Sequence, residues 1–389
     1  MGGLLITLSI ILVAIILVQI GRINELASRI RGEEETQLRR NDWNARFGLI
    51  FCVGFLVFVV ASFYSYKTRM FGFAPHYSAS EHGSWLDNMF NVTMIITGIV
   101  FFITHVLLFW YGHKYRGRQG QKAKYLPHDN KLEIIWMVVP SIVMAFLVIS
   151  GLNAWNKAMA DIPEGSVPGE DYIEIEATGF QFAWLLRYPG KDYMLGERDF
   201  RQIKPGYNEV GQVWTDKKNH DDFISDTLML PKGKTIRIRI IGRDVLHNFY
   251  LPHFRVKMDA VPGMPTYFVF TPTTTTEEYR ERLSTYPEWQ VPADPEDPDN
   301  KNERWEEFEY ELACAELCGN GHFSMRKIVK VVSQEEFDQW FNWKRSFYDD
   351  SIKGTDVDPY KEENISEEDT TPETETETEE ETEGSLTLN

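Results

Sequence analysis

Cysteine and positive charge are both scarce in this chain of 389 residues. It has three cysteines, and none stands in a Cys-x-x-Cys-His motif, which excludes a covalently attached c-type haem. Acidic residues outnumber basic ones by 58 to 40, and no basic stripe interrupts the excess, so the chain lacks the electrostatic footprint of a nucleic-acid-binding protein. Most of the net charge of -18 lies beyond Asp356, in a Thr/Glu-rich segment with too little apolar surface to fold alone.

Four apolar runs are long enough to cross the hydrocarbon layer of a membrane. They cover residues 3–20, 47–64, 90–111 and 134–152. Runs of this length and composition favour membrane spans over buried core helices. For the first run a signal peptide is the alternative, although that run has no basic start and its basic residues follow it. The sequence therefore predicts four spans.

The basic residues between the runs indicate orientation, because Lys and Arg near span ends tend to stay in the cytoplasm. The two basic loops are residues 22–46 and 114–124. If both are cytoplasmic, the N-terminus and everything after Trp155 lie outside. We expect a multi-pass protein in the lipid of the bacterial inner membrane, with its soluble part on the periplasmic side.

After Trp155 the pattern changes to short strands in which apolar and charged side chains alternate, as in 173–177 and 236–240. Polar stretches near 189–226 and 272–305 are rich in Gly, Pro and charge, and predict surface insertions. We predict a membrane α-helical anchor followed by an all-β domain over 156–347, a sandwich or a barrel with a short helix near its end. A disordered acidic tail is expected over 348–389.

Candidate metal ligands gather in residues 314–325, which read Cys-Ala-Glu-Leu-Cys-Gly-Asn-Gly-His-Phe-Ser-Met. Two thiols, an imidazole and a thioether form a soft donor set that suits copper better than calcium or magnesium. From the residues alone a disulfide between Cys314 and Cys318 stays open, because close cysteine pairs outside the cytoplasm are often oxidised. Zinc also stays open, although a Met has no use in a zinc shell and the remaining donors leave that shell incomplete.

The spacing Cys-x-Glu-x-Cys-x3-His-x2-Met resembles that of subunit II of cytochrome c oxidase. The upstream segments Asp-Val-Leu-His at 244–247 and Lys-Met-Asp-Ala-Val-Pro-Gly at 257–263 match the same family. The resemblance covers 84–343 without the two insertions. It implies a subunit II helical hairpin over 84–155, preceded in 1–83 by two additional helices, and a cupredoxin-like fold for the β domain.

The resemblance also implies a dinuclear copper centre, CuA, bridged by the two thiolates. Its ligands would be side chains of one segment and one distant His, together with a backbone carbonyl from Glu316: His247, Cys314, Cys318, His322 and Met325. In the family the carboxylate at the position of Glu316 helps to bind a magnesium ion shared with subunit I. Coordination of both thiolates would make a disulfide the wrong interpretation.

The function implied by the resemblance is electron relay. CuA would accept electrons from cytochrome c, or from a cytochrome c domain of a neighbouring complex, and pass them to haem in subunit I, which reduces oxygen to water and pumps protons. Other oxidase subunits would be partners as well. A copper-free quinol oxidase subunit, a copper delivery protein and nitrous oxide reductase each explain only part of these motifs.

Two further positions follow from the family pattern. The segment 128–136 resembles the family segment that places Glu133 at the mouth of a proton pathway; the alternative is an interfacial carboxylate beside Lys131. The family's Gly-x-Gln-Trp-x-Trp reads Gly-Phe-Gln-Phe-Ala-Trp at 179–184. Phe182 thus replaces the tryptophan at which the electron enters in the family, while Trp184 retains the second one.

Overall fold

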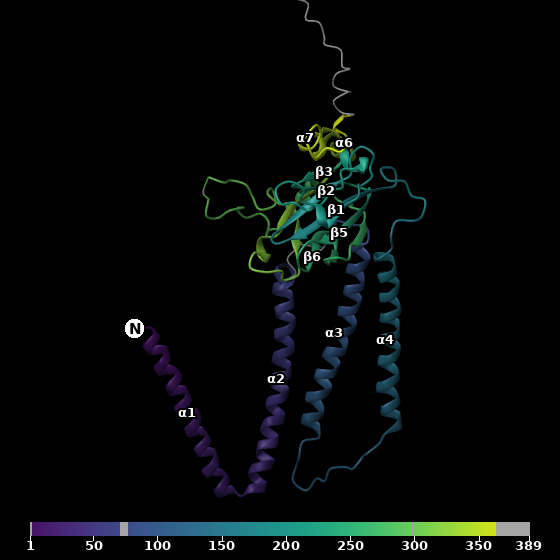
Figure 1. The fold of residues 1–389 in the computed structure, drawn as a ribbon. Helices are drawn as coiled ribbons and strands as arrows, with labels where there is room; N and C mark the ends of the chain where they lie inside the picture. Colours follow the sequence, from purple (N-terminus) through teal and green to yellow (C-terminus); the bar gives the residue numbers. More distant parts are fainter. Residues whose placement is uncertain (1, 71–76, 298, 363–389) are drawn as a thin grey trace, which may run out of the picture. The chain divides into compact units, whose positions relative to one another are not determined.

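The computed structural model describes residues 2–70, 77–297 and 299–362. The chain forms two compact units, which Figure 1 traces by colour along the sequence. One unit comprises Met1–His76 and Asp87–Asn153, and the other comprises Tyr77–Leu86 and Ala154–Asn389. The first is helical and the second is built mainly of strands.

The helical unit is formed by four long helices: α1 (Gly2–Arg31), α2 (Glu33–Met70), α3 (Gly83–Lys114) and α4 (Asn130–Ala158). Within the described residues, three stretches are long and apolar enough to cross a membrane, namely Glu33–Tyr66, Gly83–Lys114 and Asn130–Ala158. They correspond to the last three predicted runs. The first run, 3–20, is helical within α1, but several of its side chains lie outside the described residues, so a fourth span remains a prediction.

Aromatic side chains join α2 to α3. The ring centroids of Phe51 and Phe109 are 5.9 Å apart, and those of Phe55 and Phe101 are 6.2 Å apart. Cys52 is buried at the same contact. The second of the additional helices therefore packs against the first helix of the subunit II-type hairpin, and the third cysteine of the chain belongs to the membrane unit.

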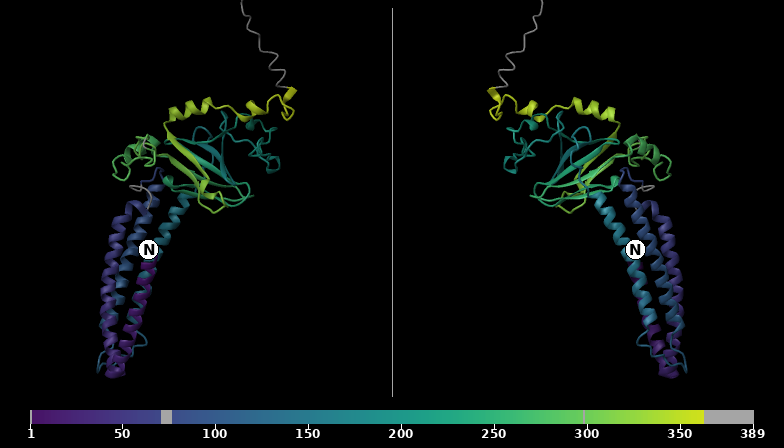
Figure 2. Two further views of the ribbon diagram at one scale, coloured as in Figure 1. Left: turned by 90° about the vertical axis from the view of Figure 1, so that its left-hand side faces the viewer. Right: turned by 90° about the vertical axis from the view of Figure 1, so that its right-hand side faces the viewer.

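The β unit is a sandwich of two five-stranded sheets, with strand orders β3-β2-β1-β5-β8 and β4-β10-β9-β6-β7. Figure 2 shows the strands as two layers, with the yellow C-terminal helices beside them. The pairs are antiparallel except β1 with β5 and β4 with β10, which are parallel. The strands are β1 (Tyr172–Phe180), β2 (Ala183–Tyr188), β3 (Phe223–Ser225), β4 (Leu228–Pro231), β5 (Thr235–Gly242), β6 (His247–Leu251), β7 (Val256–Ala260), β8 (Thr266–Phe270), β9 (Tyr310–Cys314) and β10 (Arg326–Val332). The all-β, cupredoxin-like prediction is confirmed.

Alternation along the strands creates the core. On β1 the side chains of Ile173 and Ile175 are buried between the sheets, as are those of Ile236 and Ile238 on β5. Full burial of each such side chain contributes about 1.5 to 3 kcal/mol. The charged residues between them point to the opposite face, which the insertion at 189–226 partly covers.

Both predicted insertions contribute to the folded domain as well as to its surface. The first ends in β3, which pairs with β2. The second contains helix α5 (Thr276–Leu283), which begins with a capping box between Thr275 and Glu278. Tyr279 and Leu283 of this helix are buried in the core. The second insertion was predicted as a surface loop because its composition is polar overall, although it contains two apolar side chains one helical turn apart.

The C-terminal boundary of the domain lies later than predicted. Helix α6 (Gln334–Trp343) packs Phe337 and Phe341 into the core, and α7 (Phe347–Ser351) follows it. Tyr348 is buried, and its hydroxyl donates a hydrogen bond of 2.7 Å to Asp358 Oδ1. The predicted disordered tail from 348 is therefore wrong as far as residue 362, and the rest of the tail lies outside the described residues.

Candidate metal centre

The predicted ligands meet at one end of the second sheet. His247 is the first residue of β6 and Cys314 is the last residue of β9. The chain then loops through Cys318 and a short 3-10 turn, His322–Ser324, to Met325, which directly precedes β10. Two neighbouring strands and one loop thus bring together side chains that are far apart in the sequence.

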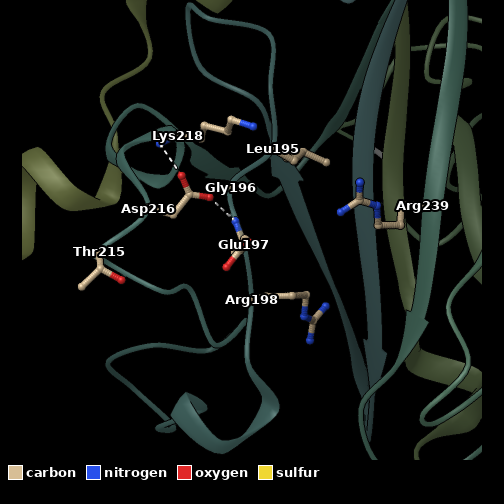
Figure 3. A pocket seen from close by; sticks show the side chains of 8 residues that line it. All are labelled: Leu195, Gly196, Glu197, Arg198, Thr215, Asp216, Lys218 and Arg239. Carbon is tan, nitrogen blue, oxygen red and sulfur yellow. Dashed lines mark hydrogen bonds between the residues drawn. The ribbon is translucent and has the colours of Figure 1, made fainter.

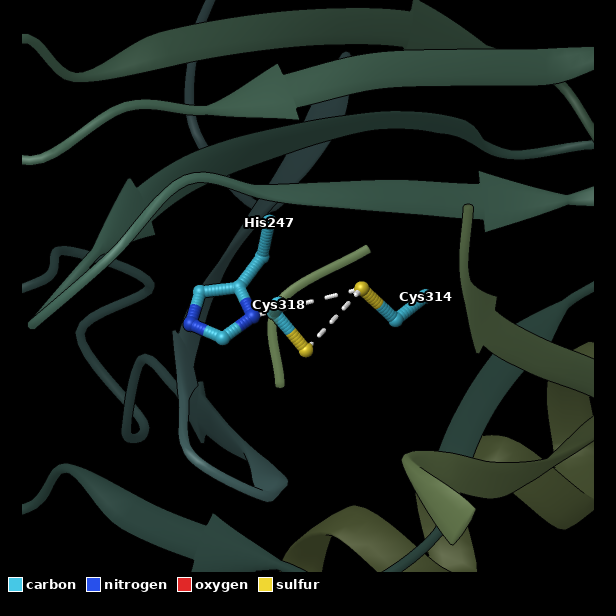
Figure 4. Close-up of side chains that lie close together, drawn as sticks. All are labelled: His247, Cys314 and Cys318. Atoms are coloured by element: carbon cyan, nitrogen blue, oxygen red, sulfur yellow. Dashed lines mark hydrogen bonds between the residues drawn. The ribbon is translucent and has the colours of Figure 1, made fainter. Parts of the chain in front are cut away.

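The donor atoms face one another across short distances. The sulfur of Cys314 lies 3.9 Å from Nδ1 of His247, 3.2 Å from the carbonyl oxygen of Glu316 and 4.0 Å from the sulfur of Cys318. Figure 4 shows both thiols and the His247 ring converging.

Two further donors complete the group on the other side of Cys318. Its sulfur lies 3.6 Å from Nδ1 of His322 and 3.8 Å from Sδ of Met325. All the predicted donors therefore surround the two thiols.

The two thiols are free cysteines in this structure. Their sulfur atoms are 4.0 Å apart, about twice the length of a disulfide bond. Burial, and next the neighbouring thiol of Cys314, raises the pKa of Cys318 to about 11. A thiol in this setting keeps its proton at neutral pH unless a cation takes its place.

Asp244 orients the His247 ring. Its Oδ1 lies 2.8 Å from Nε2 of His247, and its Oδ2 accepts a hydrogen bond of 2.8 Å from the backbone N–H of Gln181. Because the carboxylate favours the proton on Nε2, the lone pair of Nδ1 is left to face the thiols. Burial raises the pKa of Asp244, but the hydrogen bonds from Gln181, His247 and Val245 outweigh it, and the pKa lies below its ordinary value.

The chemistry of the donors fits a soft metal. The ligand atoms of His247, Cys314 and Cys318 all lie within 4.8 Å of one another, and all three residues are buried. Thiolate, thioether and imidazole donors together favour copper over hard cations. The donor set and its spacing fit a dinuclear copper centre, the cofactor that the sequence motif predicts.

Trp184 and Phe182, the two family-pattern aromatic positions of the 179–184 segment, differ in their exposure beside this group. Trp184 is buried, and its ring centroid is 6.2 Å from that of His247. Phe182 is 37% exposed and lies against the ligand loop: a Cβ added at Gly321 would come 2.5 Å from its Cγ. Phe182 therefore reaches solvent beside the ligand loop.

Gln181 and Asp244 were not predicted as parts of the site. The side-chain amide of Gln181 donates a hydrogen bond of 2.5 Å to the carbonyl of Cys318, across 137 residues of sequence. The Asp244 carboxylate is occupied by the internal bonds described above. The signal for Asp244 was its position three residues before His247.

Glu133 lies outside this site, in the first turn of α4. Its Oε1 accepts a hydrogen bond of 3.3 Å from the backbone N–H of Asp129 and lies 3.6 Å from Nδ1 of His128. It therefore caps the start of the helix. His253 is also separate: its ring packs among Tyr279 and Phe308, and burial lowers its pKa to about 4.

Comparison with known proteins identifies the family. The model of the cytochrome c oxidase subunit II transmembrane domain matches residues 67–153, and that of the periplasmic domain matches residues 173–279. The alternative cytochrome c oxidase subunit 2 of Bradyrhizobium diazoefficiens is 31% identical over 279 residues, which are 71% of this chain and 86% of that protein. Cytochrome c oxidase subunit 2 of Thermostichus vulcanus is 24% identical over 310 residues, 67% of this chain and 76% of that protein.

Among solved structures, the periplasmic domain of subunit II of cytochrome oxidase from Bradyrhizobium japonicum aligns with 25% identity and a TM-score of 0.26, over 44% of this chain and 91% of that one. The family assignment rests on the sequence matches, which span both the membrane helices and the β domain. This membrane protein with a periplasmic cupredoxin-like domain belongs to the cytochrome c oxidase subunit II family.

Proposed function

We propose that this chain is the electron-accepting subunit of a cytochrome c oxidase in the bacterial inner membrane. It takes electrons from cytochrome c at a CuA centre and delivers them to haem in subunit I, where oxygen is reduced. Membership of the subunit II family supports the assembly with oxidase subunits. The observation that carries the proposal is the convergence of three further side-chain donors and one carbonyl on the thiols of Cys314 and Cys318.

The proposed ligand roles follow from these contacts. Cys314 and Cys318 would hold the copper centre through their thiolates, His247 and His322 through Nδ1, Met325 as a weak ligand and Glu316 through its carbonyl oxygen. A dinuclear copper centre supplies a one-electron carrier whose charge is spread over two metals. The protein contributes rigidity and exclusion of water.

The residues around the thiols provide that rigidity. Asp244 holds the His247 ring through Nε2, and Gln181 holds the ligand loop through the Cys318 carbonyl. Met325 is 1% exposed and His247 is fully buried, so little water reaches the donors on this side. Ligands held in place in this way need little movement when the charge of the site changes.

We propose that Phe182 marks the surface at which cytochrome c docks. Its ring lies against Gly319 and Gly321 of the ligand loop, which also exposes Leu317 and Phe323 by 80% and 81%, and offers a flat apolar contact. Trp184 links the His247 ring to the core and supports the site from inside. Because Phe lacks the indole N–H of the family's tryptophan, we expect a dedicated or attached cytochrome c as donor.

Several finer roles belong to the same proposal. The Glu316 side chain is exposed while its carbonyl faces Cys314, so its carboxylate is available for a magnesium ion shared with subunit I. Glu133 lies in the first turn of α4, at the end that we place on the cytoplasmic side, where it would serve a proton pathway of subunit I. We also propose that α1 is a fourth span, in contact with lipid.

The test is a copper count and an electron paramagnetic resonance spectrum on the purified chain, for the parent, Cys318→Ser and Cys52→Ser. We expect a mixed-valence copper pair in the parent and in Cys52→Ser, because Cys52 lies in the membrane unit. Cys318→Ser should lose the pair, because its sulfur is the one that faces Cys314, His322 and Met325. A full copper pair in Cys318→Ser would refute the proposed centre.

The docking proposal has a separate measurement. Reduction of the copper centre by a generic soluble cytochrome c and by the native donor is compared in the parent and in Phe182→Trp. We expect the substitution to speed the generic donor more than the native one. Equal rates for both donors in the parent would contradict a dedicated partner.

A further inference from the structure

A second polar site lies on the outer face of the first sheet. A cavity of about 500 Å³ opens where the insertion at 189–226 covers β5. It is lined by Leu195, Gly196, Glu197, Arg198, Thr215, Asp216, Lys218 and Arg239. Figure 3 shows the guanidinium groups of Arg198 and Arg239 directed into the space between the insertion and the strands. We call this space the arginine pocket.

A buried carboxylate explains why two arginines gather there. Glu176 of β1 is fully buried, and strand register places it between Arg187 on β2 and Arg239 on β5. Nη1 of Arg198 lies 3.2 Å from Glu176 Oε1, while Nη1 atoms of Arg187 and Arg239 lie 3.8 and 3.9 Å from its oxygens. Three guanidinium groups therefore share one carboxylate.

This arrangement leaves donor capacity for a ligand. Each guanidinium has five N–H groups, whereas a carboxylate has two oxygens with about four acceptor positions. Arg239 also pairs with Glu174, at 3.1 Å. Burial lowers the pKa of Arg198; the charge of Glu176 opposes this most strongly, and the positive charges of Arg187 and Arg239 lower the pKa by smaller amounts. An anion in the pocket would add a second negative charge beside these guanidinium groups.

The acidic residues that line the pocket do not supply this anion. Both carboxylate oxygens of Asp216 are held by backbone amides: Oδ2 accepts from Glu197 at 2.7 Å, and Oδ1 accepts from Lys218 at 3.2 Å. Glu197 itself is exposed to solvent. The Lys218 side chain is exposed as well and adds a third positive charge to the lining.

We propose that the arginine pocket binds a small oxyanion of the phosphate class. Two planar guanidinium groups match the tetrahedral oxygens of phosphate through paired hydrogen bonds, and Lys218 adds a mobile point charge. The site is independent of the copper ligands, because Arg198 and Lys218 come from the insertion and Arg239 from the outer face of β5.

The same chemistry has a second source within the chain. The hydroxyl of Tyr360 donates a hydrogen bond of 2.9 Å to the carbonyl of Thr215, which lines the pocket. The Glu-rich residues 363–389 begin three positions after Tyr360. Their carboxylates are oxyanions too, so the experiment compares the full chain with a chain that ends after Glu362.

The probe is inorganic phosphate, titrated calorimetrically into the purified protein at low ionic strength. We expect saturable binding that weakens about tenfold in Lys218→Gln, the equivalent of one lost charge-assisted hydrogen bond, and more in Arg239→Gln. Glu197→Gln should tighten binding, because it removes a negative charge from the lining. Lys191→Gln is the matched control, an exposed lysine of the same insertion that does not line the pocket, and it should bind as the parent does.

Each outcome has a defined meaning. Equal phosphate affinity with and without residues 363–389 supports a site for a free anion, and tighter binding by the shortened chain supports occupation of the same site by its own carboxylates. Absence of saturable binding in both chains overturns the proposal. So does equal affinity of Lys218→Gln, Lys191→Gln and the parent. Copper content is measured on every variant to show that the domain has folded.

Discussion

A buried ion pair makes the stability of the β domain sensitive to one substitution. Arg187 is fully buried on β2, with Nε 3.3 Å from Asp222 Oδ2 and Nη2 donating to the carbonyl of Gly196 at 2.5 Å. Asp222 also accepts a hydrogen bond of 3.1 Å from the Gly196 N–H. Arg187→Met keeps an apolar chain of similar length but leaves Asp222 without its cation.

The expected loss is large because the remaining carboxylate cannot reach water. Removing one partner of a buried ion pair typically costs about 3 to 5 kcal/mol. Glu176 loses less stabilisation than Asp222, because Arg198 and Arg239 remain beside it. We therefore expect Arg187→Met to lower the free energy of unfolding of the domain by about 3 to 5 kcal/mol at pH 8.5.

The loss depends on pH in a direction that the structure determines. Burial raises the pKa of Asp222 to about 7 in the parent, and Arg187 opposes that rise. A carboxyl whose folded pKa is above its unfolded value stabilises the folded state at low pH, and this stability is lost as pH rises toward the folded pKa. Without Arg187 the pKa rises further. The gap between variant and parent should therefore be smaller at pH 5.5 than at pH 8.5.

Denaturant unfolding followed by tryptophan fluorescence measures the free energy of unfolding at both pH values. Arg237→Met is the matched control, because Arg237 pairs with Asp161 and Glu174 at a partly exposed position and should cost about 1 kcal/mol or less. The double variant Arg187→Met/Asp222→Asn should recover part of the loss and its pH dependence. A loss of Arg187→Met that equals the Arg237→Met loss, or that grows as pH falls, would refute the reasoning.

Three further predictions concern other parts of the chain. Glu133→Ala should slow steady-state oxygen reduction by the complex without changing the rate at which cytochrome c reduces copper; two unchanged rates would make Glu133 a helix-capping residue only. Burial lowers the pKa of His253 to about 4, so its contribution to stability is present above pH 6.5 and is lost as pH falls toward 4. His253→Gln should therefore reduce the loss of stability between pH 6.5 and 4; thermal melts in which the parent and the variant lose the same stability over this range would contradict this. Gly321→Ala should lower copper content, because its Cβ would come 2.5 Å from Phe182; Gly321→Ala combined with Phe182→Ala should restore it, and failure to do so would locate the effect in the loop backbone.

The sequence alone determined the features that depend on local pattern. Alternating Ile and charge in β1 and β5 predicted strands with one buried face, because side chains alternate across a strand. Apolar runs of about 20 residues predicted the three spans that the structure describes. The segment 314–325 holds most of the metal donors within one loop, so its composition sufficed to indicate a soft metal site, and the family motif added the distant His247.

The tertiary structure determined which distant residues contact one another. His247 reaches Cys314 over 67 residues and Gln181 reaches Cys318 over 137, through strand pairing that no local pattern specifies. By the alternation of side chains along β1, Glu176 belongs to the face directed away from the core. It is nevertheless fully buried, because the insertion covers that face and supplies Arg198. A charged side chain can occupy such a position only when other segments bring its partners, and those segments meet only in the folded chain.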